Sequence, residues 1–448
     1  MEEQIVIIGN GVSGVTLARH IRKLSNKRIT IISAESEFFF SRTALMYVYM
    51  GHMEFEHTQP YEDWFWKKNR IELKQAYVER VETEEKTLHF AEGGSMQYDK
   101  LILATGSKPN KFGWPGQDLD GAQGLYSKQD LEMLEKNAPN NKKCTHAVIV
   151  GGGLIGIEMA EMLRSRDIPV TFLVREKSFW SSVLPAEESE MINRHIIEHH
   201  IDLRLGVNLK EIKGDDKNRV TSIVIQETGE EIECDVVGLT AGVSPNIDFL
   251  KATNLELGRG VKVDRYLRTN IEDVYAIGDC AEQHEAIDER RPIEAVWYTG
   301  RMMAEALART ICEEPTKYNP GHWFNSAKFL DIEYQTYGWV WAKPKKNEAR
   351  FYWEHSKGKK CIHINYDKNT NVFIGINIFG IRMRHEKFDQ WLTEERTVEY
   401  VLKHLKDANF DPEFYLQFED DIIAKFNKEH NTQLKPLQKS WKRIFLKA

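Results

Sequence analysis

The sequence is poor in cysteine, and its few cysteines lie far apart. They are Cys144, Cys234, Cys280, Cys312 and Cys361, of which Cys280 and Cys312 are the nearest two. A redox CxxC pair, a zinc knuckle and a chain-borne iron-sulfur cluster all need closer spacing, although distant cysteines could still meet in the fold. We therefore expect buried or incidental thiols and no metal site.

Long hydrophobic runs and low-complexity segments are also missing. No apolar stretch reaches the length of a membrane-spanning helix, and the start, Met1 to Gln4, is acidic and lacks the pattern of a secretory signal. We expect a cytoplasmic protein on this basis. A net charge of -7 disfavours general nucleic-acid binding. The 448 residues exceed what a single hydrophobic core sustains, so two or three domains are expected.

A glycine turn follows the first apolar strand. Ile5 to Ile32 has the pattern strand, glycine turn, helix, strand, and the turn is Gly9-Asn10-Gly11-Val12-Ser13-Gly14. Gly9 permits a tight turn, Gly11 lets a diphosphate approach the backbone, and Gly14 allows close helix packing. The helix start around Ser13 supplies amide donors. The pattern predicts a dinucleotide site, with a ligand-free glycine turn as the alternative.

An acidic residue is expected at the end of the next strand, where it would bind the ribose hydroxyls. Glu35 follows Ile29 to Ile32 and lies 21 positions after Gly14. We predict that Glu35 contacts the ribose of the first dinucleotide, although a solvated loop carboxylate is the alternative.

The same pattern returns from Ala147 to Val174. Its turn contains Gly151, Gly153, Ile155 and Gly156. After its second strand, Arg175 suits the 2'-phosphate of NADPH, whereas the adjacent Glu176 suits the ribose of NADH, so both coenzymes stay open. Two complete turns predict that two dinucleotides are held at once.

The remaining segments suggest connecting and C-terminal structure. Gly93-Gly94 predicts a hairpin, and Asn137 to Lys143 a polar linker. Beyond Pro320, β-type runs are followed by amphipathic segments, which indicate a third, α+β module. These runs are Ala349 to Glu354, Cys361 to Tyr366 and Val372 to Phe379, and the amphipathic segments are Glu386 to Lys406 and Glu419 to Lys428.

Taken together, residues Ile5 to Ala308 resemble the pyridine nucleotide-disulfide oxidoreductases with two dinucleotide-binding domains, among them ferredoxin and rubredoxin reductases and NADH oxidases. Tyr98 to Ser107 is similar to the YDxLxxATG segment of that family, and Val274 to Asp279 to its late YAxGD motif. The resemblance implies an α/β fold with two Rossmann-like domains, the NAD(P) domain inserted in the FAD domain, and a C-terminal α+β interface-like domain. The implied limits are 1–118 and 245–319 for FAD, 119–244 for NAD(P), and 320–448 for the third domain.

The resemblance also implies cofactor contacts. Asp279 would accept hydrogen bonds from the ribityl hydroxyls of FAD. It could act as a helix N-cap at the same time. The helix opening at Thr299 would face the flavin ring, with an ordinary surface helix start as the alternative. The full set implied by the late motif, the crossover segment and this helix is Ala104, Thr105, Gly106, Gly278, Asp279 and Thr299. Arg42 is available to FAD as well.

One segment departs from the family pattern. Relatives carry a lysine or a redox cysteine in the segment that corresponds to Ser41 to Tyr47, and this chain has neither. Tyr47 stands where many ferredoxin reductases have the lysine that pairs with a glutamate equivalent to Glu158. That ion pair cannot form here, which weakens the case carried over from the family. Glu158 and Tyr47 remain the candidates for the nicotinamide pocket.

The expected function is hydride transfer from NADPH or NADH to FAD, followed by electron transfer to an external acceptor, an iron-sulfur or other carrier protein. Two alternatives stay open. The basic tail from Thr432 to Ala448 could rest on anionic lipid, as in a membrane-surface NADH:quinone reductase, or dock on its own domain. The other alternative is a nucleotide-sensing flavoprotein. Relatives use the third domain to cover the flavin or to form a dimer, so a homodimer is a further expectation.

Overall fold

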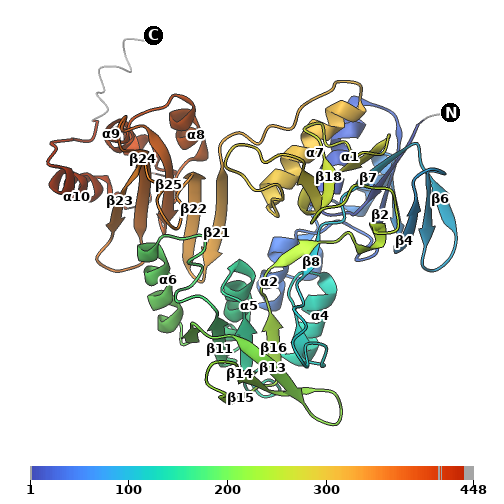
Figure 1. Ribbon diagram of the computed structural model, residues 1–448, viewed down its shortest axis with the longest axis horizontal. Helices are drawn as coiled ribbons and strands as arrows, with labels where there is room; N and C mark the ends of the chain where they lie inside the picture. Colours follow the sequence, from blue (N-terminus) through green and yellow to red (C-terminus); the bar gives the residue numbers. More distant parts are fainter. Residues whose placement is uncertain (1–2, 412–413, 415, 438–448) are drawn as a thin grey trace. The chain divides into compact units, whose positions relative to one another are not determined.

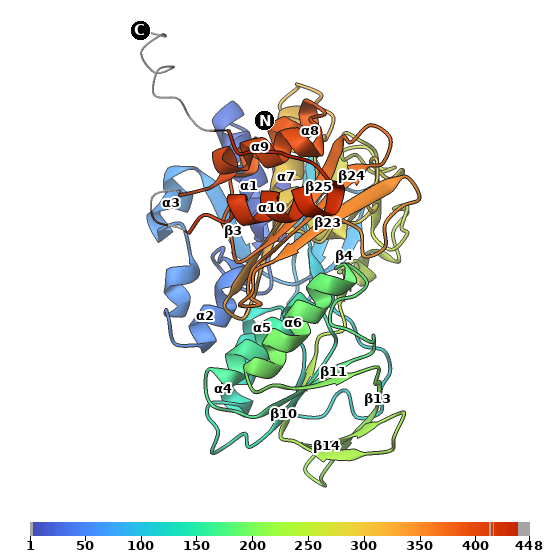
Figure 2. The ribbon, with the colours of Figure 1, turned by 90° about the vertical axis from the view of Figure 1, so that its left-hand side faces the viewer.

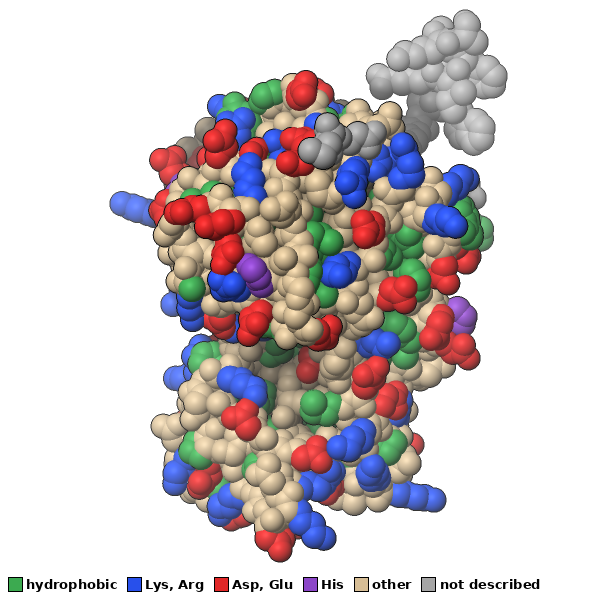
Figure 3. All heavy atoms as spheres, turned by 90° about the vertical axis from the view of Figure 1, so that its right-hand side faces the viewer, with side chains coloured by type: hydrophobic (Ala, Val, Ile, Leu, Met, Phe, Trp, Pro, Cys, Tyr) green, Lys and Arg blue, Asp and Glu red, His purple; other side chains and the backbone are tan. Residues whose placement is uncertain are grey.

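The computed structural model describes residues 3–411, 414 and 416–437, which form two compact units. The first unit comprises the described residues up to Leu173 together with Asn208–Pro320. The second comprises Val174–Val207 and the described residues from Gly321 onward. None of the helices in the described ranges combines the length and hydropathy of a membrane span. Figure 3 shows Lys and Arg side chains interspersed with Asp and Glu over one face.

The first unit contains a five-stranded parallel sheet in the order β19-β7-β1-β2-β3. Its central strand β1 has near-continuous apolar sequence because both faces of the sheet are covered. Helices α1 and α7 pack against each other in this unit (Figure 1). The strands are β1 (Gln4–Ile8), β2 (Arg28–Ser33), β3 (Ile71–Gln75), β7 (Lys100–Leu103) and β19 (Val274–Ala276).

A second parallel sheet has the order β11-β10-β16-β9 within this unit. Both expected strand-helix-strand units are therefore present, as is the α/β fold class. These strands are β9 (Ala122–Gln123), β10 (Ala147–Val150), β11 (Val170–Val174) and β16 (Val236–Leu239). The helices are α1 (Val12–Leu24), α2 (Leu45–Tyr49), α3 (Asp63–Lys68), α4 (Lys128–Asn137), α5 (Leu154–Arg164) and α7 (Trp297–Ile311), with 3-10 turns η1 (Arg42–Ala44), η2 (Phe55–Thr58), η3 (Asp248–Leu250) and η4 (Gly278–Cys280).

Shorter sheets complete the first unit. Gly93 and Gly94 both have positive φ between β5 and β6, so the expected hairpin is confirmed. The antiparallel sheets are β4 (Val78–Glu82), β5 (Thr87–Phe90) and β6 (Ser95–Gln97), and β13 (Leu209–Gly214), β14 (Val220–Ile225) and β15 (Glu231–Glu233). The strand pairs are β8 (Ser107–Pro109) with β17 (Val243–Pro245), and β18 (Val261–Val263) with β20 (Ala281–Gln283).

The second unit is built on an antiparallel sheet in the order β21-β22-β25-β24-β23, which confirms the expected C-terminal α+β module. One sheet face forms a core with α8, α9 and α10 (Figure 2). The strands of this sheet are β21 (Phe324–Phe329), β22 (Ile332–Gly338), β23 (Glu348–Glu354), β24 (Cys361–Asp367) and β25 (Phe373–Phe379). The unit also contains β12 (Asp202–Leu205), which is not part of this sheet. The helices are α6 (Ala186–Glu198), α8 (His385–Thr393), α9 (Val398–Ala408) and α10 (Glu419–His430).

Helix α6 contacts the opposite face of this sheet. The fully buried Glu188 of α6 accepts a hydrogen bond of 2.9 Å from Nδ2 of Asn377 and lies 3.3 Å from Nδ1 of His363. Asn377 and His363 alternate along β25 and β24 with the apolar residues that face α8 to α10. Polar contacts therefore hold α6 on the face of the sheet opposite to the one that packs against α8, α9 and α10.

The amphipathic segment Glu386 to Lys406 forms two helices, α8 and α9, with a break between them at Glu395. The backbone of Glu395 is left-handed, with φ of 49°, and the amide of Arg396 donates to the carbonyl of Trp391 at 3.0 Å, which ends α8. Thr397 then caps α9 by accepting from the amide of Tyr400. The basic tail continues beyond α10, and its residues 438–448 lie outside the described part of the chain.

Candidate functional site

The first glycine turn lies at the carboxyl end of β1 and requires glycine at two positions. Gly9 has φ of +116°, and a Cβ built there would lie 2.1 Å from the carbonyl oxygen of Ala104. A Cβ on Gly14 would lie 2.0 Å from the carbonyl oxygen of Gly9. Both contacts are far below van der Waals distance, so the turn closes onto β7 and α1 only because side chains are missing there.

The space in front of this turn is open. Gly11 is the N-cap of α1, makes no side-chain capping bond, and a Cβ built on it would meet no atom within 4 Å. Behind it, the hydroxyl of Ser13 would lie 2.5 Å from a Cβ on Gly278 and 2.4 Å from one on Gly300. The start of α1 is therefore packed closely from behind and exposes its amides in front. This geometry fits a bound diphosphate.

The second turn repeats this arrangement. Gly151 has φ of +123°, and its Cβ would lie 2.7 Å from the backbone of Thr240. A Cβ on Gly156 would lie 2.3 Å from the carbonyl oxygen of Gly151. Gly153 is the uncapped N-cap of α5, with no atom within 4 Å of its Cβ position. Each of the three glycines thus has the same physical role as its counterpart in the first turn, and Ile155 lies in the opening turn of α5.

Glu35 and Arg42, both predicted to contact the FAD, form an ion pair. Arg42 donates to both carboxylate oxygens of Glu35, at 2.9 and 2.6 Å. The amide of Lys128 donates to Glu35 at 2.8 Å. Burial lowers the pKa of Arg42, but the hydrogen bonds and charge of Glu35 outweigh it, so the net pKa is raised. This bidentate geometry fixes both side chains where β2 ends.

Asp279 lies in the 3-10 turn η4 that follows β19, at the same sheet edge as the first glycine turn. The hydroxyl of Ser107 donates to its carboxylate at 3.2 Å. The hydroxyl of Tyr126 accepts from the amide of Ser107 at 3.0 Å, and the guanidinium of Arg42 lies 4.4 Å from the centre of the Tyr126 ring. Burial raises the pKa of Asp279, an effect that Ser107 and Arg42 partly offset.

Tyr126 and Ser107 were not among the predicted site residues. Ser107 ends the crossover segment, so its motif carried a signal, whereas Tyr126 belongs to no motif and could not have been found from the sequence. Burial, followed by the nearby Asp279, raises the pKa of Tyr126 to about 12, so its hydroxyl stays protonated. The two residues link Asp279 to Arg42 through a continuous polar network.

The other hydroxyl candidates make local backbone contacts. Thr105 donates to the carbonyl of Asn246 at 2.8 Å, and Thr299 donates to the carbonyl of Val296 at 2.8 Å. Gly106 has φ of +67°. These contacts shape the crossover and the start of α7, and cofactor contacts of Thr105, Gly106 and Thr299 stay predictions.

The two candidates for the nicotinamide pocket lie on neighbouring helices. Tyr47 is on α2 and Glu158 on α5, and these helices pack against each other. The ring of Tyr47 also stacks on that of His52, with centroids 6.0 Å apart. The structure thus brings together the elements that carry both residues.

Arg175 and Glu176 pair with each other. Nη2 of Arg175 lies 2.8 Å from Oε1 of Glu176, and the Arg175 side chain is 75% exposed. The predicted determinant for NADPH is therefore engaged by the predicted determinant for NADH.

Residues 3–304 match the pyridine nucleotide-disulphide oxidoreductase family. The chain belongs to this family. The predictions of an NAD(P)H-dependent flavin oxidoreductase and of FAD with NAD(P)H as cofactors are confirmed at the level of the family. The open, uncapped starts of α1 and α5 fit one dinucleotide each.

Two relatives illustrate the range of proteins that are similar to this chain in sequence. A nitrite reductase [NAD(P)H] from Bacillus subtilis (strain 168) is 30% identical over 70% of this chain, which spans only 38% of that protein. A ferredoxin-NAD(P)+ reductase from Sphingomonas sp is 30% identical over 75% of this chain and 80% of its own length. The chain thus covers less than two thirds of the first of these relatives.

Solved structures share the fold. The reductase of a covalent putidaredoxin reductase-putidaredoxin complex matches 94% of this chain and 98% of its own length, with a TM-score of 0.78 and 19% identity. At this identity the likeness concerns the fold.

In contrast to the family name, the five thiols of this chain are poorly suited to redox exchange. All five lie in the described residues and are unpaired, and four are buried. Burial raises the pKa of Cys144 and of Cys234 to about 12. Burial also raises the pKa of Cys280, which follows Asp279 and contacts the carbonyls of Leu103 and Ile277 at 3.3 Å. A protonated thiol is not the attacking species in disulfide exchange.

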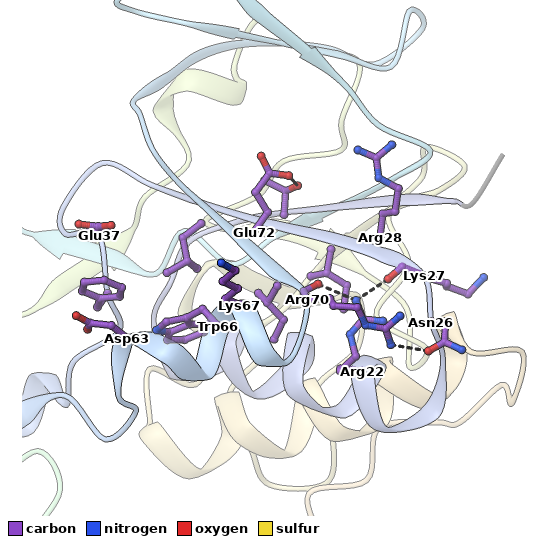
Figure 4. Close-up of a pocket in the computed structure, with 15 residues that line it drawn as sticks. Arg22, Asn26, Lys27, Arg28, Glu37, Asp63, Trp66, Lys67, Arg70 and Glu72 are labelled. Atoms are coloured by element: carbon purple, nitrogen blue, oxygen red, sulfur yellow. Dashed lines mark hydrogen bonds between the residues drawn. The ribbon is translucent and has the colours of Figure 1, made fainter.

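A hollow of about 680 Å³ lies along β2, β3 and α3, away from the first glycine turn (Figure 4). Arg22 lines it and donates to the backbone carbonyls of Asn69, Arg70 and Lys27. This guanidinium ties the ends of α1, β2 and β3 together. Arg22 therefore has a structural role, and we assign no cofactor to the hollow.

Proposed function

We propose that the chain uses NAD(P)H to reduce bound FAD and delivers the electrons to an external iron-sulfur or other carrier protein. The observation that carries this proposal is the state of the five thiols, which are unpaired and, by burial, held protonated. Without an internal disulfide relay, electrons must leave the flavin directly for another molecule. FAD supplies the needed chemistry because it accepts a hydride and releases electrons singly.

The residues have distinct tasks in this proposal. The amides at the starts of α1 and α5 bind the two diphosphates, and the open positions at Gly11 and Gly153 admit them. Asp279 and the Glu35–Arg42 pair orient the FAD at the carboxyl ends of β19 and β2. Tyr47 and Glu158 flank the nicotinamide.

Relatives support a protein acceptor. One similar protein is named a ferredoxin-NAD(P)+ reductase, and a structure of the same fold is a reductase joined to putidaredoxin. The quinone alternative depends on the basic tail, most of which lies outside the described residues. The nucleotide-sensing alternative differs from the proposed enzyme in that it predicts slow reduction of the flavin by NAD(P)H.

Anaerobic stopped-flow absorbance tests the proposal. Flavin bleaching by NADPH or NADH within about a second is expected for an enzyme with ordinary turnover. Subsequent mixing with oxidised ferredoxin or rubredoxin should restore the flavin absorbance faster than mixing with a soluble quinone. Slow reduction with a long-lived charge-transfer complex would instead favour the sensor, and preferential reoxidation by quinone would favour the quinone reductase.

Coenzyme choice gives a second, smaller prediction. Arg175→Ala is expected to weaken NADPH binding by about 1 kcal/mol, the value for an exposed charged hydrogen bond, and to leave NADH binding unchanged. Glu176→Gln is the matched variant, because it frees Arg175 and should weaken only NADH. Steady-state KM values for both coenzymes measure the effect. Equal NADPH affinity in the wild type and in Arg175→Ala would contradict the assignment of Arg175.

A further inference from the structure

Two histidines and an aspartate meet in the second unit, outside the residues assigned to the dinucleotides. His195 lies in the last turn of α6, and His199 is the residue that ends this helix. Asp331 lies in the tight turn between β21 and β22. Residues four apart on a helix share one side, so both imidazoles face this turn. Figure 1 shows α6 beside the β21–β22 hairpin.

The three side chains are close enough to share one ion. Each offers one ligand atom, and these atoms all lie within 4.8 Å of one another. Nε2 of His199 is 3.4 Å from Oδ1 of Asp331, which is about the edge of a tetrahedron with metal-ligand bonds of about 2.0 to 2.1 Å. Nε2 of His195 contacts the same carboxylate oxygen, and the two rings are 4.3 Å apart.

The nitrogens of these histidines are available as ligands. His195 is only 2% exposed, and its Nε2 points at Oδ1 of Asp331, which would be a ligand of the same ion. Nδ1 of His199 lies 2.9 Å from the carbonyl oxygen of His195, which can only accept, so a neutral His199 has its lone pair on Nε2. In protein metal sites, a hydrogen bond of this kind, made by the ring nitrogen that does not bind the metal, orients the histidine.

Charges around the cluster are consistent with a cation. Glu198 lies 3.8 Å from Nδ1 of His195, on the side away from Asp331. The one competing cation in the described surroundings is Lys359, whose Nζ is 3.5 Å from Oδ2 of Asp331.

We propose that His195, His199 and Asp331 form a binding site for a divalent metal ion, for which zinc is the best match. Two imidazoles and a carboxylate suit zinc and its first-row neighbours, and water would complete the coordination. A bound ion links the end of α6 to the β21–β22 turn. The site is independent of the proposed electron transfer and departs from the expectation of no metal, for which the His-x-x-x-His spacing was the overlooked signal.

Metal titration of the full chain tests the site. After removal of metals with a chelator, zinc is expected to bind saturably with one ion per chain by calorimetry. Cobalt(II) should give visible ligand-field bands without a thiolate charge-transfer band. His199→Gln and Asp331→Asn remove exposed or half-exposed ligands and should each raise the Kd by more than about 100-fold. His200→Asn is the control, since His200 is exposed, has φ of 59°, and asparagine tolerates that backbone.

Lys359→Gln is a variant expected to act in the opposite direction. Removing the ammonium frees Asp331, so zinc affinity should rise by about two- to fivefold, the value of one exposed ion pair. A loss of binding from misfolding cannot imitate this gain. Failure of the wild type to bind zinc, equal affinity in the wild type, His199→Gln and Asp331→Asn, or no gain in Lys359→Gln would each overturn the proposed site.

Discussion

Protein carrying Gly11→Asp is expected to fold normally and to purify without flavin. The substitution fits the backbone, because Gly11 has φ of -70° and ψ of -176°, a region open to any residue, and its Cβ position is free of neighbours within 4 Å. The new carboxylate would stand at the start of α1, where we place the FAD diphosphate. Like-charge repulsion of about 3 to 4 kcal/mol would raise the Kd for FAD about 100- to 1,000-fold.

Gly11→Ala is the matched control, since it adds the same Cβ without a charge. We expect this variant to bind FAD within about tenfold of the wild type. Flavin absorbance per chain and calorimetric titration with FAD measure the loss, and circular dichroism with thermal melting confirms the fold. A yellow Gly11→Asp protein with unchanged flavin content would mean that FAD does not bind at the start of α1.

The glycine turns could be predicted from the sequence because their constraints are local. A positive φ at Gly9 and the contact of Gly14 with the Gly9 carbonyl arise within a few residues of the turn. The adjoining strands are recognisable as apolar runs of parallel-sheet type. For the same reason the hairpin at Gly93-Gly94 was predicted correctly.

Contacts between distant residues could not be predicted in this way. Ser107 follows β7 and Asp279 follows β19, and they meet because these two strands are neighbours in the sheet. Tyr126 joins them from a segment without a motif. The ion pair of Glu35 with Arg42 was likewise unforeseen, although each residue was selected alone. Asp331 lies far in sequence from His195, so only the fold brings the carboxylate to the histidine pair.

The helix break at Glu395 has a different cause. Amphipathic periodicity continues through this position because α8 and α9 both pack on the same core. Periodicity alone therefore cannot tell one long helix from two short ones. The capping threonine, Thr397, was the local signal that the pattern concealed.

Gly153→Asp is the counterpart of Gly11→Asp and should separate the two nucleotides. Gly153 has φ of -120° and ψ of -173°, and its Cβ position is equally open, so the chain should again fold. The carboxylate now stands at the start of α5, where we place the diphosphate of NAD(P)H. We expect a yellow protein with full FAD content whose KM for NAD(P)H rises about 100-fold or more, by the same repulsion.

The flavin of this variant should still be reduced by dithionite, which needs no nucleotide site, while reduction by NAD(P)H slows at every concentration below the new KM. Gly153→Ala controls for the added Cβ and should reduce its flavin nearly as fast as the wild type. We expect Gly11→Asp to lose FAD and Gly153→Asp to lose only its response to NAD(P)H. If instead Gly153→Asp lost FAD and Gly11→Asp lost only the response to NAD(P)H, FAD would bind at the second turn and NAD(P)H at the first. Loss of FAD in both variants would show that the turns do not act as separate sites.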